Sequence, residues 1–204
     1  MNLDTTQLMA IAAGLGWASG LRLYSVLFLT GLAGLMGWVD LPPGLQLLQH
    51  PLMLGASGCM LFIEFFADKI PGVDTVWDVL HTVVRVPAGA ALAAAVFGTD
   101  HATAAAVAAL LGGTLAATSH VAKATTRAAA NTSPEPFSNI GLSLLGDGAV
   151  PVMLWLSWVH PLAFFAALAC ILVLMVAVTF VFAKFLRQLA RRLSSWLGRS
   201  QPSV

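Results

Sequence analysis

Charged side chains are so widely spaced in this sequence that long uncharged intervals decide what it can fold into. No Asp, Glu, Lys or Arg occurs from Leu41 to Ile63, from His101 to Ala122, or from Gly148 to Ala183. Charged residues make up 9% of the chain, against about 25% in ordinary soluble domains. Because so few polar groups could not cover a water-exposed surface, the sequence predicts an integral membrane protein made of helices.

Six transmembrane helices fit these intervals, because a helix needs roughly 20 residues to cross the hydrocarbon core. The fold class that we expect is all-α and polytopic, with helices near 7–38, 50–67, 76–98, 102–121, 140–158 and 162–184. The first is too long for one crossing, so it is either a tilted helix broken near Gly20-Leu21-Arg22 or two short segments. Seven spans is the alternative count. Residues 1–184 would form one transmembrane domain, followed by a basic amphipathic cytoplasmic tail at 185–204.

The positions of Lys and Arg predict which side of the membrane each loop faces, since cytoplasmic loops carry an excess of both. With six spans, nine of the ten Lys and Arg residues fall on the side of the tail, and the loops on the other side hold none. Only Arg22 stays within the membrane. We therefore expect both termini in the cytoplasm. The first apolar segment has no basic residue before it, unlike a signal peptide, so we expect it to be retained.

Two halves of the chain, 5–98 and 102–184, resemble each other weakly. The segment from Gly16 to Arg22 can be aligned with the segment from Leu115 to Val121, and each reaches a Ser and then a cation. With three spans in each half, such a repeat would be inverted across the membrane, as in secondary transporters with interrupted helices. Small residues also recur wherever membrane helices pack closely, so a true repeat and simple helix packing both remain open.

Arg22 is the one charged residue between Asp4 and Asp40. A cation at the bilayer centre costs about 3 kcal/mol or more and normally faces a partner or a water-filled cavity. The carboxylate candidate within an apolar run is Glu64. The two residues could form a gate, or a substrate or proton site; the alternative is a structural ion pair that fixes the register of two helices. An intramembrane ionisable residue is functional by default, which favours the first interpretation.

A dense polar run surrounds the helix break at Pro71-Gly72. Its members would lie on one face of each flanking helix, and they are Glu64, Asp68, Asp74, Asp78, His81 and Arg85. The four carboxylates could bind a divalent cation such as Mg²⁺, or they could relay protons together with the histidine. The alternative is a cytoplasmic connection in which Asp74 caps the second helix and Asp78 pairs with Arg85 or Lys69.

A basic and polar stripe occurs in the second half of the chain and consists of His120, Lys123, Arg127 and Asn131. The segment at 132–139 follows it, is irregular, and contains two prolines. Such a segment could line an aqueous vestibule or re-enter the membrane. The stripe could bind a phosphate or another anion, or it could pair with the acidic stripe of the first half.

Motifs for nucleotide-driven or hydrolytic chemistry are not found in this sequence. It contains no phosphate-binding P-loop, no zinc-binding His-Glu-x-x-His helix and no Gly-x-Ser-x-Gly elbow. Aromatic and basic residues are not interleaved as a nucleic-acid surface requires. We therefore expect no nucleic-acid partner, and no cofactor unless the acidic run holds a divalent cation.

Four runs of the sequence are specific enough to compare with known families. They are Gly20 to Tyr24, Glu64 to Asp78, Arg85 to Ala90 and Asn131 to Asn139. These runs resemble a bacterial family of small membrane proteins catalogued as a domain of unknown function, number four thousand one hundred and twenty-six. The likeness extends from about residue 8 to residue 183. It implies a protein of the bacterial inner membrane and brings no activity with it.

We expect a small secondary transporter or channel for an ion or a small charged solute, and not an enzyme. Arg22 and Glu64 would form the site within the membrane. The acidic run would form a cation or proton site on the cytoplasmic side, and the basic stripe would complete a vestibule. The residues that we expect along the pathway are Arg22, Glu64, Asp68, Asp74, Asp78, His81, Lys123, Arg127 and Asn131.

Two other functions remain open. A Mg²⁺-dependent membrane enzyme acting on a lipid phosphate would use the carboxylate pairs Glu64/Asp68 and Asp74/Asp78, although the Asn that precedes the first pair in polyprenyl transferases is missing. A non-catalytic scaffold would have polar stripes that pair only with each other and leave no solvent cavity. The lipid bilayer is a partner in every case, and a homo-oligomer is compatible with each.

Overall fold

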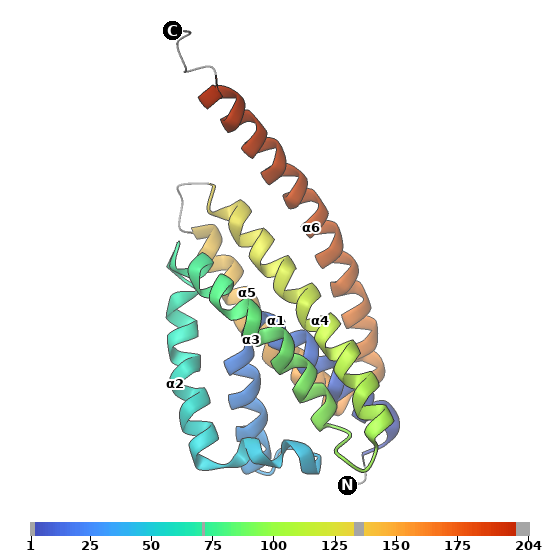
Figure 1. Ribbon diagram of the computed structural model, residues 1–204. Coiled ribbons are helices and arrows are strands. Elements are labelled where there is room, and N and C mark those ends of the chain that lie inside the picture. Colours follow the sequence, from blue (N-terminus) through green and yellow to red (C-terminus); the bar gives the residue numbers. More distant parts are fainter. Residues whose placement is uncertain (1–2, 71, 133–136, 199–204) are drawn as a thin grey trace.

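The computed structural model describes residues 3–70, 72–132 and 137–198, and every regular element in these ranges is a helix. The elements are α1 (Thr5–Leu35), the short 3-10 helix η1 (Pro43–Gln49), α2 (Pro51–Ala67), α3 (Val73–Ala95), α4 (Ala102–Ala130), α5 (Phe137–Val159) and α6 (Pro161–Gly198). They pack into one bundle, with α6 on its outside and reaching beyond the other helices (Figure 1).

Four helices in the described ranges are long and apolar enough to cross a membrane, namely α1, α4, α5 and the part of α6 at Pro161–Arg192. Together, η1 and α2 would make a fifth crossing, bent by 69° where they join. The remaining long helix, α3, buries Asp74, Asp78, His81 and Arg85 on one face. The predicted class of helical membrane protein is thus supported, while the predicted count of about six spans is not confirmed.

The first helix is broken at Arg22, whose φ of −149° and ψ of 78° lie outside the helical region. The break therefore falls where the sequence predicted it. Before the break, α1 packs closely along α4 through small residues. A Cβ added at Gly16 would lie 2.5 Å from the Cα of Gly112, and one added at Gly20 would lie 2.1 Å from the carbonyl oxygen of Ala116. Side chains at these two positions would keep the helices apart.

After the break, α1 reverses its direction. The ring of Phe28 packs at Gly58, and Gly31 packs at Leu54. The second half of α1 is therefore antiparallel to α2. Because α2 and α4 run in the same direction, the two halves of α1 run in opposite directions (Figure 1). The helix thus starts and finishes at the same end of the bundle.

The reversal of α1 places the start of α1 and the end of α6 at opposite ends of the bundle (Figure 1). The six-span map instead put both termini on one side. The difference arises because the sequence pattern marks a break at Arg22 but not the change of direction there. We call the end that holds the α2–α3 turn and the end of α6 the basic end. The start of α1 and the connections at the other end (36–50, 96–101 and 160) contain no Lys or Arg.

The two segments that aligned as a weak repeat lie against each other. Gly20 packs on Ala116, and the hydroxyl of Ser119 donates a 2.7 Å hydrogen bond to the carbonyl oxygen of Trp17. Their shared small residues are therefore the two faces of one close helix contact. An inverted repeat is not confirmed.

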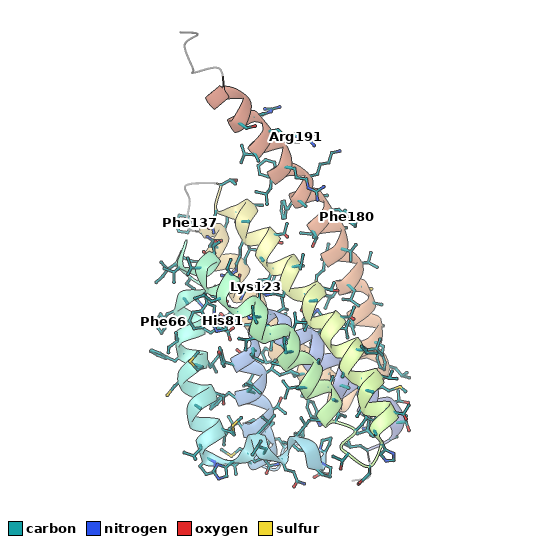
Figure 2. All side chains as sticks on the ribbon, viewed as in Figure 1. Phe66, His81, Lys123, Phe137, Phe180 and Arg191 are labelled. Atoms are coloured by element: carbon teal, nitrogen blue, oxygen red, sulfur yellow. The ribbon has the colours of Figure 1, made fainter. Side chains whose placement is uncertain are left out.

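The basic tail continues the last helix, since α6 extends without interruption to Gly198. Arg191 lies on the part that extends past the bundle (Figure 2). Residues 199–204 of the predicted tail, and residues 133–136 of the predicted irregular segment, lie outside the described residues. The side chains of Leu193 and Trp196 in the tail are also not described.

Apolar side chains fill the centre of the bundle and also cover its outside. Ile11, Leu15 and Trp17 of α1 are at most 1% exposed, so α1 is the central helix. Phe66 and Phe180 are 49% and 74% exposed and lie on opposite flanks (Figure 2). An exposed apolar surface of this extent is typical of a protein that contacts lipid.

Candidate functional site

Most of the polar residues that the sequence analysis singled out come together in one buried cluster between α1, α2, α3, α4 and α5. Five cations and five carboxylates are joined there by ion pairs, so their formal charges cancel. We call this cluster the charge network. It consists of Arg22, Lys69, Arg85, Lys123 and Arg127 with Glu64, Asp68, Asp74, Asp78 and Asp147.

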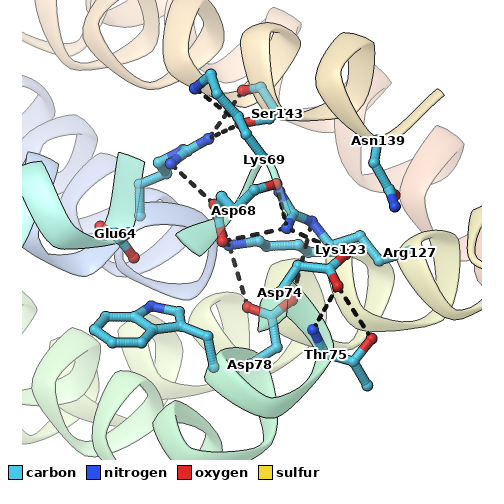
Figure 3. Close-up of polar contacts among 12 residues, drawn as sticks. Glu64, Asp68, Lys69, Asp74, Thr75, Asp78, Lys123, Arg127, Asn139 and Ser143 are labelled. Atoms are coloured by element: carbon cyan, nitrogen blue, oxygen red, sulfur yellow. Dashed lines mark hydrogen bonds and ion pairs between the residues drawn. The ribbon is translucent and has the colours of Figure 1, made fainter. Parts of the chain in front are cut away.

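Asp68 is at the centre of the charge network, where it ends α2. Its Oδ2 lies 2.9 Å from both Arg22 Nη1 and Lys123 Nζ, and its Oδ1 lies 3.2 Å from Arg127 Nη1. Figure 3 shows Lys123 and Arg127 directed toward it. A fully buried carboxylate costs several kcal/mol unless it is paired. The three cations, which come from α1 and α4, provide that pairing and hold the end of α2 against both helices.

Arg22 connects the break in α1 to α5 as well as to α2. Its Nη2 lies 3.0 Å from Asp147 Oδ1 and donates hydrogen bonds to the hydroxyl and carbonyl oxygens of Ser143, at 2.8 and 3.0 Å. Beside the break, Lys123 Nζ donates a hydrogen bond to the carbonyl oxygen of Leu21 at 3.0 Å. Arg22 is 1% exposed, so the break stands inside the protein with its polar groups bound.

The ion pair expected between Arg22 and Glu64 does not form. Glu64 Oε1 instead lies 2.8 Å from Nη2 of Arg85, and Nη1 of Arg85 lies 2.7 Å from Asp78 Oδ1. Both members of the Glu64–Arg85 pair are fully buried. The pairing of Asp78 with Arg85, which we considered as the structural alternative, is confirmed. The sequence did not indicate that Asp68, at the end of α2, and not Glu64 would reach Arg22.

His81 links α3 to α1 beside the charge network. Its Nδ1 lies 2.8 Å from the carbonyl oxygen of Trp77, which can only accept, so Nδ1 carries a proton. In the neutral ring, Nε2 is then left to accept from the hydroxyl of Tyr24 at 3.1 Å. The imidazole stacks on the Trp77 indole, with ring centroids 4.1 Å apart. His81 thus borders the carboxylates and contributes no ion pair among the described residues.

His120 is the counterpart of His81 on α4. Thr82 donates its hydroxyl proton to the carbonyl oxygen of Asp78 at 2.9 Å, so its oxygen accepts from His120 Nε2 at 2.8 Å. Nδ1 of His120 then accepts from Nη1 of Arg85 at 3.3 Å. A continuous chain of hydrogen bonds therefore joins α3 to α4 behind the Glu64–Arg85 pair.

Asn131 binds the start of α3 at the basic end. Its Nδ2 donates to the hydroxyl of Thr75 at 2.9 Å and to Asp74 Oδ1 at 3.2 Å, and its Oδ1 accepts from Asn139. Asp74 Oδ1 also accepts from the backbone N–H groups of Gly72 and Thr75, but the N-cap residue of α3 is Gly72 and Asp74 lies inside the helix, so the cap expected at Asp74 is wrong. The acidic and basic stripes therefore meet, as the complementary-pairing alternative predicted.

Several residues of the site were missed by sequence reasoning. Lys69 Nζ lies 3.0 Å from Asp147 Oδ2 and 3.1 Å from the centroid of the Phe65 ring, and Asn139 and Ser143 are buried polar residues of α5. Asp147 gave one usable signal, since it is the lone charge within the predicted span at 140–158. An intramembrane carboxylate is a functional candidate by the rule that selected Arg22.

The four carboxylates considered for Mg²⁺ do not gather as metal ligands. Within the described ranges, no group of three or more His, Cys, Asp or Glu side chains is arranged to hold a metal ion. Glu64, Asp68, Asp74 and Asp78 each face an Arg or Lys. In a low-dielectric interior, carboxylates brought together without a cation would repel one another strongly, and the pairing with cations avoids that repulsion.

A cavity of about 890 Å³ lies beside the charge network, between α1, α4, α5 and α6. Its charged lining residues are Arg22, Lys123 and Arg127, and no carboxylate is among the described residues that line it. Most of the remaining wall is apolar. The three cations thus have the carboxylates of the network on one side and the cavity on the other.

A broken central helix, several helices able to span a membrane and a buried, balanced charge network define this chain as a polytopic helical membrane protein. A family model described as "Domain of unknown function (DUF4126)" matches residues 9–180. The chain belongs to that family, which confirms the resemblance seen in the sequence. No curated protein and no solved structure matches the chain. The family has no assigned activity, so the function must be argued from the site.

Proposed function

We propose that the protein is a secondary transporter or channel for a small charged solute, and that the solute is an anion. One observation carries the proposal. Arg22 stands at a helix break inside the bundle and lines a cavity together with Lys123 and Arg127. No carboxylate is among the described residues that line this cavity. Interrupted helices that carry polar groups at the break recur in secondary transporters. A surface of three cations would attract an anion.

The ion pairs behind the cavity supply a way to couple binding to movement. An anion bound by Arg22 would compete with Asp147, which is 20% exposed and is the less buried of the two carboxylates that hold this guanidinium. Exchanging one anion for another keeps the buried charge balanced, which avoids the large cost of an unpaired charge. Release of Asp147, together with the hydrogen bonds from Arg22 to Ser143, would free α5 to move relative to α1, because these contacts join the two helices.

The distribution of basic residues supports an orientation with the basic end in the cytoplasm of a bacterial inner membrane. Lys69 lies at the α2–α3 turn and Lys184, Arg187 and Arg191 lie in the last part of α6. The connections at the other end hold no Lys or Arg, which is the asymmetry that sets orientation in the membrane. In this arrangement the start of α1 would face the periplasm rather than the cytoplasm.

The scaffold alternative has less support. It requires polar stripes that pair only with each other, whereas Arg22, Lys123 and Arg127 also line a cavity. The enzyme alternative requires carboxylates free to hold Mg²⁺, whereas Glu64, Asp68, Asp74 and Asp78 are paired with cations. We therefore favour solute movement without a catalytic step.

Flux through reconstituted protein tests the proposal. Proteoliposomes would be loaded in turn with chloride, phosphate, acetate, Na⁺ and K⁺, and efflux compared with empty liposomes. We expect flux of at least one anion, lost in Arg22→Gln and Arg127→Gln and retained in Arg191→Gln, which removes an exposed charge from the end of α6. Gel filtration would confirm that each variant is folded. Cation flux that persists in Arg22→Gln, or the lack of any anion flux by folded wild-type protein, would contradict the proposal.

A further inference from the structure

We infer that the anion bound in this cavity carries an apolar tail, so that the ligand is an anionic amphiphile with a phosphate or carboxylate head and an alkyl chain. The inference rests on the proposed function in one respect only, the assignment of anion binding to Arg22, Lys123 and Arg127. It adds the chemical class of the ligand, and it comes from the size, walls and mouth of the cavity.

The cavity is larger and more apolar than an inorganic ion requires. Its volume of about 890 Å³ falls in the range of roughly 300–1,000 Å³ found for sites that enclose organic molecules. The apolar part of the wall is built by α5 and α6 from Leu142, Leu145, Ile171, Leu174, Met175 and Val178. Water filling this volume would face aliphatic carbon on most sides, and an alkyl chain would remove that carbon from water.

The mouth of the cavity faces the apolar outside of the bundle. Leu145 and Leu174 line the cavity and are 71% and 62% exposed, so they stand where it opens. On a membrane helix such a surface contacts lipid chains. A hydrated ion would have to cross this apolar mouth, whereas an amphiphile already in the bilayer could slide its chain between α5 and α6. Thr132 and Ser138 line the cavity at its basic end, where polar head groups lie in a membrane.

The cations are suited to an oxyanion head. Arg22 and Arg127 are 1% and 3% exposed, and a guanidinium binds two oxygens of a phosphate or carboxylate side by side. Nη1 of Arg22 lies 2.9 Å from Asp68 yet makes no hydrogen bond of acceptable geometry among the described residues. This buried donor therefore has capacity for an additional acceptor. The head of one amphiphile would match the cationic residues of the lining, and its tail would match the apolar wall.

Binding by the full chain, purified in a neutral maltoside detergent, tests the inference. The protein would be titrated calorimetrically with dodecyl phosphate, butyl phosphate, inorganic phosphate and dodecyltrimethylammonium. We expect dodecyl phosphate to bind at least about tenfold more tightly than butyl phosphate, because the extra methylenes are buried, and inorganic phosphate to bind most weakly. The ammonium compound has the same tail and the opposite charge, and we expect no binding. Equal affinity for the dodecyl and butyl phosphates, or binding of the ammonium compound, would overturn the inference.

Trp17 reports where the ligand lies, because it lines the cavity and is 1% exposed. A dodecyl phosphate brominated along its tail should quench part of the tryptophan fluorescence, and Trp17→Phe should remove that part. Val178→Trp would fill the space beside the apolar wall and weaken dodecyl phosphate binding about fivefold or more. Val173 lies on the same helix and is 71% exposed, so Val173→Trp would not weaken this binding. If Val178→Trp fails to fold, Met175→Gln tests the same wall. Quenching that is unchanged in Trp17→Phe would place the ligand elsewhere and overturn the inference.

The two proposals fail in different ways. Flux of small anions, with binding that does not depend on tail length, would contradict the inference of an amphiphilic ligand and support the proposal of a transporter. Dodecyl phosphate could instead bind tightly, depending on its tail, and lose this binding in Arg127→Gln, while no anion shows flux. That result would support the inferred ligand class and contradict the proposal of a transporter.

Discussion

Arg22 Nη1 and Asp68 Oδ2 lie 2.9 Å apart in the interior of the bundle, and at most 1% of either side chain is exposed. This pair joins the point where α1 breaks to the point where α2 ends. Each of these points leaves backbone groups without helical partners, and Lys123 and Arg127 donate to the carbonyl oxygens of Leu21 and Asp68. The charge network therefore stabilises a chain reversal that neither helix could maintain alone.

Removing the carboxylate at the centre of the network should destabilise the protein more than removing Arg22, one of the three cations around it. Asp68→Asn leaves Arg22, Lys123 and Arg127 short of a partner, and breaking a buried pair typically costs about 3–5 kcal/mol. Arg22→Gln leaves Asp68 with two other cations and should cost less. The free energy of unfolding in mixed micelles, obtained by SDS titration, measures both. A loss below about 1 kcal/mol in Asp68→Asn would contradict the central role of this carboxylate.

Glu64 should be energetically coupled to Arg85 and only weakly to Arg22. Glu64 Oε1 and Arg85 Nη2 are 2.8 Å apart in a fully buried pair, and residues in direct contact show coupling of roughly 0.5–3 kcal/mol. Double-mutant cycles with Glu64→Gln, Arg85→Gln and Arg22→Gln, based on the same unfolding measurement, compare the two pairs. A larger coupling for Glu64 with Arg22 than with Arg85 would restore the pairing expected from sequence.

Close packing of α1 on α4 should make Gly20 intolerant of even one added methyl group. A Cβ there would lie 2.1 Å from both Ala116 O and Ser119 Oγ, so backbone would have to shift, and overpacking of this kind costs about 1–3 kcal/mol. Gly55→Ala is the matched control, because no atom lies within 4 Å of its added Cβ and Ala favours the helix. Unfolding midpoints of the two variants should therefore move in opposite directions. A stabilised Gly20→Ala variant would show that the helices are farther apart than described.

The two ends of the chain should be reachable from opposite sides of the membrane. The exposed residues Thr5 and Gln188 would be replaced by Cys one at a time, after Cys59 and Cys170 are changed to Ser. A maleimide that cannot cross the membrane should label Thr5→Cys in intact cells and Gln188→Cys only after permeabilisation. Protection of both positions in intact cells would mean that both termini are cytoplasmic, as the six-span map had it.

Magnesium should have little effect on stability. The carboxylates of Glu64, Asp68 and Asp78 are each within 3.2 Å of an Arg or Lys nitrogen, and a divalent cation could bind them only by displacing those partners. Unfolding temperatures in Mg²⁺ and in EDTA should agree within about 1 °C, since a ligand that does not bind the folded state does not stabilise it. A rise of several degrees with Mg²⁺ would revive the enzyme interpretation.

Much of the candidate site could be found from sequence because polar residues are conspicuous in an apolar chain. Arg22, Asp78 and Lys123 stood out by their type and position alone, and all three lie in the charge network. Asp147 is the lone charge of its helix, so the rule that selects Arg22 also selects Asp147.

The choice of partners could not be read from sequence. Helical periodicity places residues on one face of their own helix, but which face of a neighbouring helix it meets depends on how small residues let the two approach. Gly16 and Gly20 bring α1 against α4, which brings Lys123 to the carbonyl oxygen of Leu21 and to Asp68. Arg85, from the next helix along the chain, is then the cation that reaches Glu64.

The sequence by itself determined the class of protein, the family and the place of the break in α1, because hydropathy, charge spacing and motif identity are local properties of the chain. Only the tertiary structure decided that α1 reverses at Arg22, that Asp68 rather than Glu64 is its partner, and that three cations border a cavity. These outcomes depend on long-range packing. A buried charge takes whichever opposite charge the packed helices bring within about 3 Å, and residues distant in sequence supply it.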